Sequence, residues 1–465
     1  MTFTVKKTAA TAMAVAMSLA VLAGCGSNNN NGNTASSASP EPTASAPADN
    51  SAANAAGNTG GDAPATTGLK GTFEIQYFVG GYGDKWWKQV IADFQKANPD
   101  LKIVEDAGPQ INTQNKPKWI AGTPPDFVYI DGPELNDRQL AEDGQLEDLT
   151  DWIKDAKNVD GVKILDLLAQ QPPSYEGKTY NIPLVLNSWG VFYNKALFEK
   201  NSWTEPTDWD SFIATSEKIK AAGTTPFIHT GKYPYYINGA ILYPAIVSAN
   251  NDDYKLLQDM GDSNVDAFKS PAVLEALNKI VELRDKGFID KTSISINHTD
   301  SQMLFLQNKD AFIPNGLWLP NEMSKDVPAD FKFGFIPSVT QKAGGKVVAN
   351  TSTSTVAISK NGKNKEAAKA FLQFIFSQSQ ASKFAELSGA PSNIKGDISA
   401  SNAPDFVKQA AAYLTSDKTV VVPTVTFNAD VDKAMQDATD ALTIGKIDPQ
   451  GWVDRVVKVV EKVKK

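Results

Sequence analysis

Apolar and polar positions alternate with two different periods along the chain from residue 69 onward. Residues 71–78 (GTFEIQYF) alternate one by one, which predicts a strand, whereas residues 86–98 place large apolar side chains three or four apart, which predicts a helix. Strands are then predicted at 101–105 and 126–131, and a helix at 135–143. Repeated strand–helix units are typical of an α/β domain with a largely parallel sheet.

The same alternation continues to the C-terminus. Further strands are predicted at 189–194, 226–230, 311–313, 331–336 and 355–359. Further helices are predicted at 207–222, with a capping box formed by Thr207 and Asp210, and at 272–285, 365–377, 429–443 and 449–463.

Two loops of this pattern are candidates for ligand binding. Ligands of open α/β sheets bind where loops leave the carboxyl ends of strands. The loop after the first predicted strand carries Tyr82, and the loop after the third carries Asp131. An alternative for Asp131 is that it caps the following helix, and the sequence leaves both interpretations open.

The first 68 residues follow a different pattern. Lys6 and Lys7 precede an apolar stretch that ends in Leu-Ala-Gly-Cys25, which is typical of an export signal. Small residues before the cysteine resemble the bacterial lipoprotein box, so we expect residues 1–24 to be a lipoprotein signal peptide and Cys25 to be lipidated. The alternative is an ordinary signal peptide with a chance cysteine. Residues 25–68 are Asn, Ser, Ala, Pro, Gly and Thr and predict a disordered tether.

Composition narrows the possible functions. A chain of 465 residues suggests two domains, because single cores stop growing near ~250–300 residues. The net charge is −8 and there is no basic block, so we expect no nucleic-acid partner. Cys25 is the single cysteine and there are two histidines, which excludes a thiol nucleophile and a His-rich zinc site in the folded part. Oxygen-liganded Ca²⁺ or Mg²⁺ stays open, although no metal or other cofactor is expected.

A tryptophan stands in an unusual place near residue 318. The apolar run 311–313 meets Pro-Asn-Gly, and Trp318 follows two residues after the glycine, close to Asn315 and Glu322. An indole face with planar polar neighbours suits the apolar face and the hydroxyl rim of a sugar ring. The alternative is that Trp318 packs in a core.

Several stretches together resemble the extracellular solute-binding proteins of bacterial ABC importers, in the carbohydrate-binding group. No single stretch is specific for this family, but the order and spacing of the stretches together are. They are GTPPDFVYID (122–131), GQLEDLTDWI (144–153), NIPLVLNSWGVFYNKALFEK (181–200), EPTDWDSF (205–212), AFIPNGLW (311–318) and NGKNKEAAKAFLQFI (361–375).

The resemblance implies a two-lobed α/β fold of the periplasmic-binding-protein type, with hinge strands and discontinuous lobes. It places the first lobe at 69–187 and 351–398 and the second lobe at 188–350 and 399–465.

The resemblance also implies a set of ligand-binding residues. Trp318 would stack on a sugar ring, Asn187 would contact the ligand from a hinge strand, and Tyr235 and Phe427 would be aromatic cleft residues. Buried structural roles remain open for Asn187 and Trp189, and a surface role for Tyr235. The full candidate set is Tyr82, Asp131, Asn187, Trp189, Tyr235, Asn315, Trp318, Glu322 and Phe427. His229 is interpreted as a structural residue at the end of a strand.

The implied function is capture of a sugar for delivery to the permease subunits of an ABC importer, by a monomer anchored through lipid on the outer face of a Gram-positive-type cell membrane. The segment GLWLPNEM resembles binders of N-acetylglucosamine and chitobiose, while malto-, cello- and xylo-oligosaccharides stay open. The rival class is a secreted carbohydrate-active enzyme, which needs two placed carboxylates. No catalytic motif appears, so we expect no enzyme.

Overall fold

The computed structural model describes residues 68–132 and 134–464. The predicted signal peptide, the lipidation at Cys25 and nearly all of the predicted tether lie outside the described residues. Within them, no helix combines the length and the apolar character that crossing a membrane requires.

Nine strands form the sheet, in the order β2-β1-β3-β8-β4-β6-β5, with β7 paired to β4 and β9 paired to β8. The strands are β1 (Gly71–Phe78), β2 (Leu101–Gly108), β3 (Phe127–Ile130), β4 (Asn181–Asn194), β5 (Thr225–Phe227), β6 (Asp310–Gly316), β7 (Phe333–Ile336), β8 (Val347–Ile358) and β9 (Thr419–Val422).

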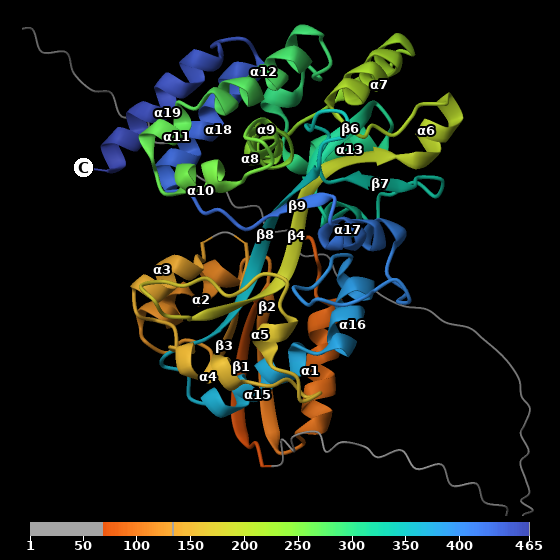
Figure 1. The fold of residues 1–465 in the computed structure, drawn as a ribbon. Helices are drawn as coiled ribbons and strands as arrows, with labels where there is room; N and C mark the ends of the chain where they lie inside the picture. Colours follow the sequence, from red (N-terminus) through yellow and green to blue (C-terminus); the bar gives the residue numbers. More distant parts are fainter. Residues whose placement is uncertain (1–67, 133, 465) are drawn as a thin grey trace, which may run out of the picture. The chain divides into compact units, whose positions relative to one another are not determined.

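Helices follow most of the strands along the chain (Figure 1). The helices before β5 are α1 (Lys85–Ala97), α2 (Ile111–Ile120), α3 (Asp137–Glu142), α4 (Thr150–Asp155), α5 (Ile164–Leu167), α6 (Lys195–Asn201) and α7 (Trp209–Ala221). Those between β5 and β7 are α8 (Tyr235–Ile237), the π-helix η1 (Asn238–Leu242), α9 (Tyr243–Ala249), α10 (Lys255–Gly261), α11 (Val265–Phe268), α12 (Pro271–Asp285), the 3-10 helix η2 (Ser293–Ser295), α13 (His298–Leu306) and α14 (Leu319–Glu322). Those after β8 are α15 (Lys365–Ile375), α16 (Gln378–Ser388), α17 (Asp405–Thr415), α18 (Ala429–Thr443) and α19 (Pro449–Val463).

Strand β4 joins two sections of the sheet. Its first half, residues 181–188, pairs with β8, and its second half, residues 189–194, pairs with β6 and β7. Strand β8 also divides, because residues 347–350 pair with β9 and residues 355–358 pair with β3. Figure 1 shows β4 and β8 running side by side between the helices around β1–β3 and the helices around β5–β7. The two long strands therefore hold both sections in one structure.

The first section has an aromatic core. Helix α1 presents Trp87, Val90 and Phe94 on one buried face, as its spacing predicted. The Phe371 ring of α15 lies 5.0 Å from the rings of both Phe94 and Phe127. Such side chains each contribute about 1.5–3 kcal/mol when buried, so this core holds the loops after β1 and β3 in place.

Three sequence predictions need correction. The sheet is mixed rather than largely parallel, because the returning strands β4 and β8 run antiparallel to each other and β8 runs antiparallel to β3. The capping box of α7 uses Asp208 and Ser211, one residue later than predicted. The strand predicted at 189–194 begins at Asn181 instead. The prediction missed residues 181–188 because Pro183 is unusual inside a strand and because side chains buried on both faces show no alternation of apolar and polar residues.

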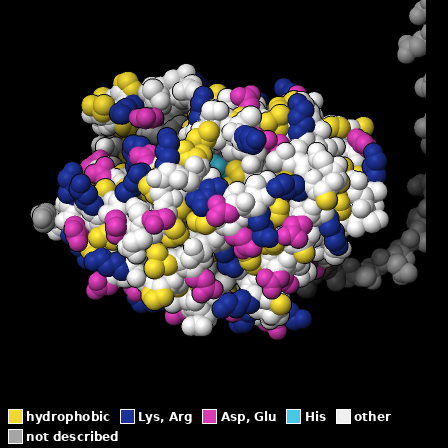
Figure 2. All heavy atoms as spheres, turned by 90° about the horizontal axis from the view of Figure 1, so that it is seen from above, with side chains coloured by type: hydrophobic (Ala, Val, Ile, Leu, Met, Phe, Trp, Pro, Cys, Tyr) yellow, Lys and Arg dark blue, Asp and Glu magenta, His cyan; other side chains and the backbone are white. Residues whose placement is uncertain are grey.

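Charged side chains of both signs are mixed over the face shown in Figure 2, with apolar side chains between them.

Candidate functional site

Two tryptophans meet where strands β4 and β6 pair. Trp189 lies opposite Gly316 in the antiparallel register, and Trp318 follows as the N-cap of α14. The two indole rings have centroids 5.0 Å apart and planes 88° apart. A Cβ at Gly316 would lie 2.2 Å from Trp318 Cζ3, so glycine is what allows the Trp318 ring to fold back over the strand.

Three tyrosines complete an aromatic cluster around this pair. The ring of Tyr236 lies 5.8 Å from Trp189 and 6.2 Å from Trp318, and Tyr235 stacks on Tyr236 at 4.6 Å. The ring of Tyr82, from the loop after β1, lies edge-on to Trp318 at 6.3 Å. The structure therefore brings four predicted site residues together, and adds Tyr236, the neighbour of Tyr235 in the sequence.

Asn187 connects three segments beneath the cluster. Its Oδ1 accepts hydrogen bonds from the Tyr82 hydroxyl at 3.0 Å and from the Leu317 backbone N–H at 3.1 Å. Its Nδ2 donates to Ser352 Oγ at 3.0 Å. The side chain is buried, with both polar atoms in use, so in this conformation it holds the site together.

The loop after β1 also contacts the segment around Trp318 directly. Asn321 Nδ2 donates to the Gly81 carbonyl at 2.5 Å. A Cβ at Gly81 would lie 2.8 Å from Trp318 Cβ, so the backbone of this loop approaches the tryptophan closely. Loops from both sections of the sheet thus meet at Trp318.

An open cavity of about 270 Å³ lies beside the cluster, and we call it the inner cavity. Its walls combine aromatic faces with amide, hydroxyl and carboxyl groups. They include Trp189, Tyr235, Tyr243, Asn350, Ser352, Phe427 and Asp432. Trp318 does not line it but packs behind Trp189. Aromatic faces with a few convergent polar groups suit a neutral, hydroxyl-rich ligand.

The backbone behind Trp189 has an unusual form. Residues 238–242 form a π-helix, a rare form that occurs often at functional sites. A Cβ at Gly239 would lie 2.8 Å from Trp189 Cδ2, and the Gly239 carbonyl accepts a hydrogen bond from Asn350 Nδ2 at 2.8 Å. Sequence reasoning missed both Gly239 and Asn350, because no local pattern reveals a contact across 111 residues.

Asp131 lies on the loop after β3, as predicted. Its Oδ2 accepts a hydrogen bond from the Tyr129 hydroxyl at 3.2 Å. Burial raises the pKa of the Asp131 carboxyl. Burial also raises the pKa of Tyr82, and the negative charge of Asp131 adds to that increase. The helix that follows is capped by Asn136, so Asp131 does not cap it. Asp131 therefore faces the Tyr82 side of the cluster rather than the inner cavity.

Asn315 and Glu322 flank the Trp318 segment. Asn315 Oδ1 accepts from the Gly316 N–H at 2.9 Å, while its buried Nδ2 has no partner among the described residues. Glu322 accepts a hydrogen bond from Gln302 at 2.9 Å and lies 3.4 Å from His298 Nε2. Burial acts to raise the pKa of Glu322, but these two partners outweigh it and hold the pKa below its usual value.

Phe427, the last residue of the candidate set, lines the inner cavity from the C-terminal part of the chain. Phe427 is on the segment before α18, and its ring lies 5.4 Å from that of Tyr243. His229 is buried after β5, and burial lowers its pKa to about 4. Among residues 68–132 and 134–464, no cluster of three or more His, Cys, Asp or Glu side chains has a geometry suited to a metal ion.

Comparison with protein families gives a match over most of the folded part. Residues 80–382 match the model of the family described as bacterial extracellular solute-binding protein. The diacetylchitobiose binding protein NgcE of Streptomyces coelicolor is 28% identical over 346 residues, which are 71% of each chain. A multiple sugar-binding protein of Streptococcus mutans is 23% identical over 335 residues, 69% of this chain and 75% of that one.

Solved structures agree on the fold. A chitin oligosaccharide binding protein superposes with a TM-score of 0.67 at 20% identity, covering 85% of this chain and 99% of the other. The apo form of RafE from Streptococcus pneumoniae superposes with a TM-score of 0.65 at 24% identity, covering 86% and 100%. The prediction of a two-lobed α/β fold is confirmed, while the sequence ranges of the lobes stay a prediction.

Proposed function

The chain belongs to the family of bacterial extracellular solute-binding proteins, and we propose that it is the substrate-binding lipoprotein of a carbohydrate ABC importer. The proposed ligand is N-acetylglucosamine or a short chitooligosaccharide such as N,N′-diacetylchitobiose. The choice of sugar is supported by the diacetylchitobiose-binding relative from Streptomyces coelicolor and by the fold shared with a chitin oligosaccharide binding protein.

One observation carries the proposal: the inner cavity sets aromatic rings beside polar side chains. Trp189 and Tyr235 offer ring faces to the apolar side of a pyranose, and Asn350 and Ser352 offer an amide and a hydroxyl to its rim. Trp318 supports Trp189 from behind in this conformation. We propose that it also contacts sugar when the loop after β1 moves away.

The proposed mechanism is closure of two lobes over the sugar. The hydrogen bonds from the Leu317 N–H to Asn187 and from Asn321 to the Gly81 carbonyl join the two sheet sections, and opening would break them. A sugar that contacts both sides only when they are closed shifts the population towards the closed form. We propose that the closed form then docks on membrane permease subunits.

The setting is proposed from the N-terminal residues. Lipid on Cys25 and a tether over 25–68 would hold a monomer on the outer face of a Gram-positive-type cell membrane. The protein would capture sugar without changing it, as a binding protein rather than an enzyme.

The test is calorimetric titration of the full chain with N-acetylglucosamine, diacetylchitobiose, maltose, cellobiose and xylobiose, with product analysis of each mixture. We expect tight binding of a chitin sugar that is recovered intact. Trp189→Ala should weaken binding about 30-fold, the effect of a buried aromatic anchor. Trp152→Ala on α4 is the matched control and should leave the affinity unchanged, because Trp152 lies outside the inner cavity.

Other outcomes would change the assignment. Tight binding of maltose, cellobiose or xylobiose alone would move the ligand to that sugar class. Cleaved sugar would overturn the binding function and direct attention to paired carboxylates. Equal loss of binding in Trp189→Ala and Trp152→Ala would remove the inner cavity as the site.

A further inference from the structure

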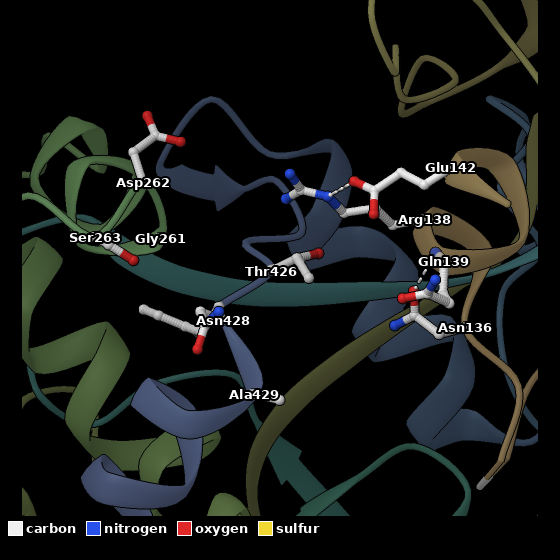
Figure 3. Close-up of a pocket in the computed structure, with 11 residues that line it drawn as sticks. Asn136, Arg138, Gln139, Glu142, Gly261, Asp262, Ser263, Thr426, Asn428 and Ala429 are labelled. Atoms are coloured by element: carbon white, nitrogen blue, oxygen red, sulfur yellow. Dashed lines mark hydrogen bonds and ion pairs between the residues drawn. The ribbon is translucent and has the colours of Figure 1, made fainter. Parts of the chain in front are cut away.

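Two further cavities of the protein differ in the chemistry of their walls. One of about 720 Å³, which we call the polar gap, has Arg138 of α3 on one side and Asp262, just after α10, on the other (Figure 3). The second, of about 440 Å³, we call the apolar cavity. Its volume lies within the range of about 300–1,000 Å³ that small-molecule sites usually occupy, and the proposed function makes no use of it.

The wall of the apolar cavity is built mostly from aliphatic side chains. They come from β4, the segment between α16 and α17, α17 itself and β9, and they include Leu186, Ile394, Ile398, Leu414 and Val421. Lys395 is exposed at the same wall, and its ammonium group has no ion-pair partner within residues 68–132 and 134–464. No Asp or Glu is among the described residues that line this cavity. An apolar interior beside one free positive charge suits an aliphatic chain with an anionic head group.

Hydrogen bonds in the surrounding chain hold one wall of the apolar cavity in place. Asn393, which is 0% exposed, accepts from the Gln170 N–H at 2.8 Å and donates to the Gln170 carbonyl at 2.8 Å. Gln170 lines the apolar cavity, and so does Leu186, whose N–H donates to the Pro391 carbonyl at 3.2 Å. This wall is therefore fixed before a ligand binds.

The same wall is bonded to a residue of the inner cavity. The Gln170 side-chain amide donates to the Thr351 hydroxyl, which donates to the Val422 carbonyl of β9 at 2.6 Å. Thr351 lines the inner cavity. A shift of Gln170 or of β9 would therefore act on the wall of the inner cavity.

The apolar cavity and the inner cavity lie on opposite sides of β4. Successive side chains of a strand point to opposite faces. Leu186 lines the apolar cavity, whereas Asn187 bonds the residues beneath the aromatic cluster and Trp189 lines the inner cavity. Strand β4 thus separates the apolar cavity from the inner cavity.

The walls of the apolar cavity come from both sheet sections. Leu414 lies on α17, whose Phe406 ring packs against Phe333 of β7 with centroids 6.1 Å apart. The opposite wall at Ile394 forms an isolated bridge with Leu168, just after α5. A rotation that separates the two sections on the inner-cavity side of β4 would widen the polar gap and narrow the apolar cavity behind it.

We propose that the apolar cavity is a regulatory site for a medium-chain aliphatic carboxylate. Its chain is buried among the aliphatic side chains, and its carboxylate pairs with Lys395. Because the bound chain keeps the cavity open, it favours the present conformation and raises the affinity for sugar at the inner cavity. The effect on sugar rests on the proposed function, whereas binding of the carboxylate does not.

The first test is calorimetric titration of the full chain with decanoate, which should bind at a single site. Octanoate should bind about 15-fold more weakly, because each methylene removed from water is worth about fourfold in affinity. Lys395→Gln should weaken decanoate binding about threefold and leave decanol binding unchanged. Lys418→Gln, at an exposed lysine just before β9, is the matched control and should bind decanoate like the wild type.

A second variant tests the space rather than the charge. Ala411 of α17 lines the apolar cavity, and Ala411→Trp should fill it and abolish decanoate binding. Ala412→Trp, on the exposed side of the same helix, controls for a new indole and should bind decanoate normally. Thermal melting of each variant shows that it is folded.

The regulatory role is tested by following the conformation. Spin labels at Arg138→Cys and Asp262→Cys, in a chain that carries Cys25→Ser, report the width of the polar gap. Decanoate alone should shift the distance distribution to shorter values. Decanoate should also raise the affinity for diacetylchitobiose about fivefold, and the sugar should raise the affinity for decanoate by the same factor.

Four results would overturn the proposal or part of it. Absence of saturable decanoate binding, or equal binding by Ala411→Trp, would remove the site. Equal binding of decanoate and decyltrimethylammonium would exclude a carboxylate as the preferred ligand. Binding without a change in the spin-label distance would exclude the regulatory role. Binding to the Cys25→Ser chain but not to a lipidated chain would mean that the protein's own acyl group fills the cavity.

The same measurements separate the site from the proposed function. If decanoate binds and narrows the polar gap while no sugar binds, the proposed function fails and the carboxylate site stands. If a chitin sugar binds while decanoate does not, the carboxylate site fails and the proposed function stands.

Discussion

Asn187 offers the sharpest test of how the site is held together. Its side chain bonds Tyr82 from the loop after β1, Leu317 from the end of β6 and Ser352 from β8. Replacing it with alanine removes all three hydrogen bonds and adds no new group. The variant therefore measures the free energy that this junction contributes to the folded state.

The magnitude follows from the surroundings of each partner. Tyr82 and Ser352 are partly exposed, so each lost bond should cost about 1 kcal/mol, since water replaces Asn187. Leu317 is 0% exposed, so its N–H would be left buried without an acceptor at a cost of about 1–3 kcal/mol. We expect Asn187→Ala to lower the free energy of unfolding by about 3–5 kcal/mol in total.

Urea unfolding followed by tryptophan fluorescence measures this change in the free energy of unfolding, and we expect the m-value to be the same for the variant and the wild type. A double-mutant cycle isolates one bond: Tyr82→Phe should cost about 1 kcal/mol in the wild type and close to nothing in Asn187→Ala. Asn201→Ala, at the exposed end of α6, is the control and should change stability by no more than about 0.5 kcal/mol.

Two results would refute the reasoning. A loss smaller than about 1 kcal/mol in Asn187→Ala would mean that the three hydrogen bonds contribute little together. An equal cost of Tyr82→Phe in both backgrounds would mean that Tyr82 and Asn187 do not interact in solution.

Three further predictions follow from single contacts. Gly239→Ala places a Cβ 2.8 Å from Trp189 Cδ2, so calorimetry should show sugar affinity reduced about tenfold; unchanged affinity would mean that the ring position is unimportant. The pKa of His298 is raised by its hydrogen bond to Glu322, whose own pKa is lowered, so the pair stabilises the fold between the two pKa values. Its contribution should be lost as pH rises through the raised pKa of His298, and His298→Gln should destabilise the protein at about pH 5.5 but not at pH 9; a pH-independent difference would contradict this. Burial raises the pKa of Asp310 to about 7, so the folded state binds its proton more tightly than the unfolded state and stability should fall as pH rises from about 4 to 7. Asp310→Asn should therefore be more stable than the wild type at about pH 8 by urea unfolding, and an equal or lower midpoint would show that the carboxylate has a partner in solution.

Local pattern was enough for much of the fold. Helices α18 and α19 have the predicted bounds, because their apolar stripes are long and regular and Pro449 opens the last one. Strand β1 was also predicted with its observed bounds. The short helices between residues 235 and 268 were not predicted, because their side chains are buried on several sides and show no single stripe.

The structure brings several of the predicted site residues together, while their role in ligand binding stays a prediction. Tyr82, Asn187, Trp189, Tyr235 and Trp318 lie in one cluster, as expected from a ligand site. The open space, however, lies on the Trp189 side rather than over Trp318. Which face of an indole ring is covered depends on residues that are distant in the sequence. The local pattern of apolar and polar residues carries no information about these contacts.

The sequence by itself indicated the α/β class of the fold and the family. The fold class depends on the order of residues within about twenty positions, which hydrophobic periodicity and turn residues record directly. The family was indicated by the resemblance of several motifs in their order along the chain. Only the tertiary structure decided that Asn187 bonds partners 105 and 130 residues away, and that Gly239 lies against Trp189. The physical reason is that the two long strands β4 and β8 bring four distant segments to one place, and packing there selects which polar atoms are paired and which surfaces stay open to a sugar.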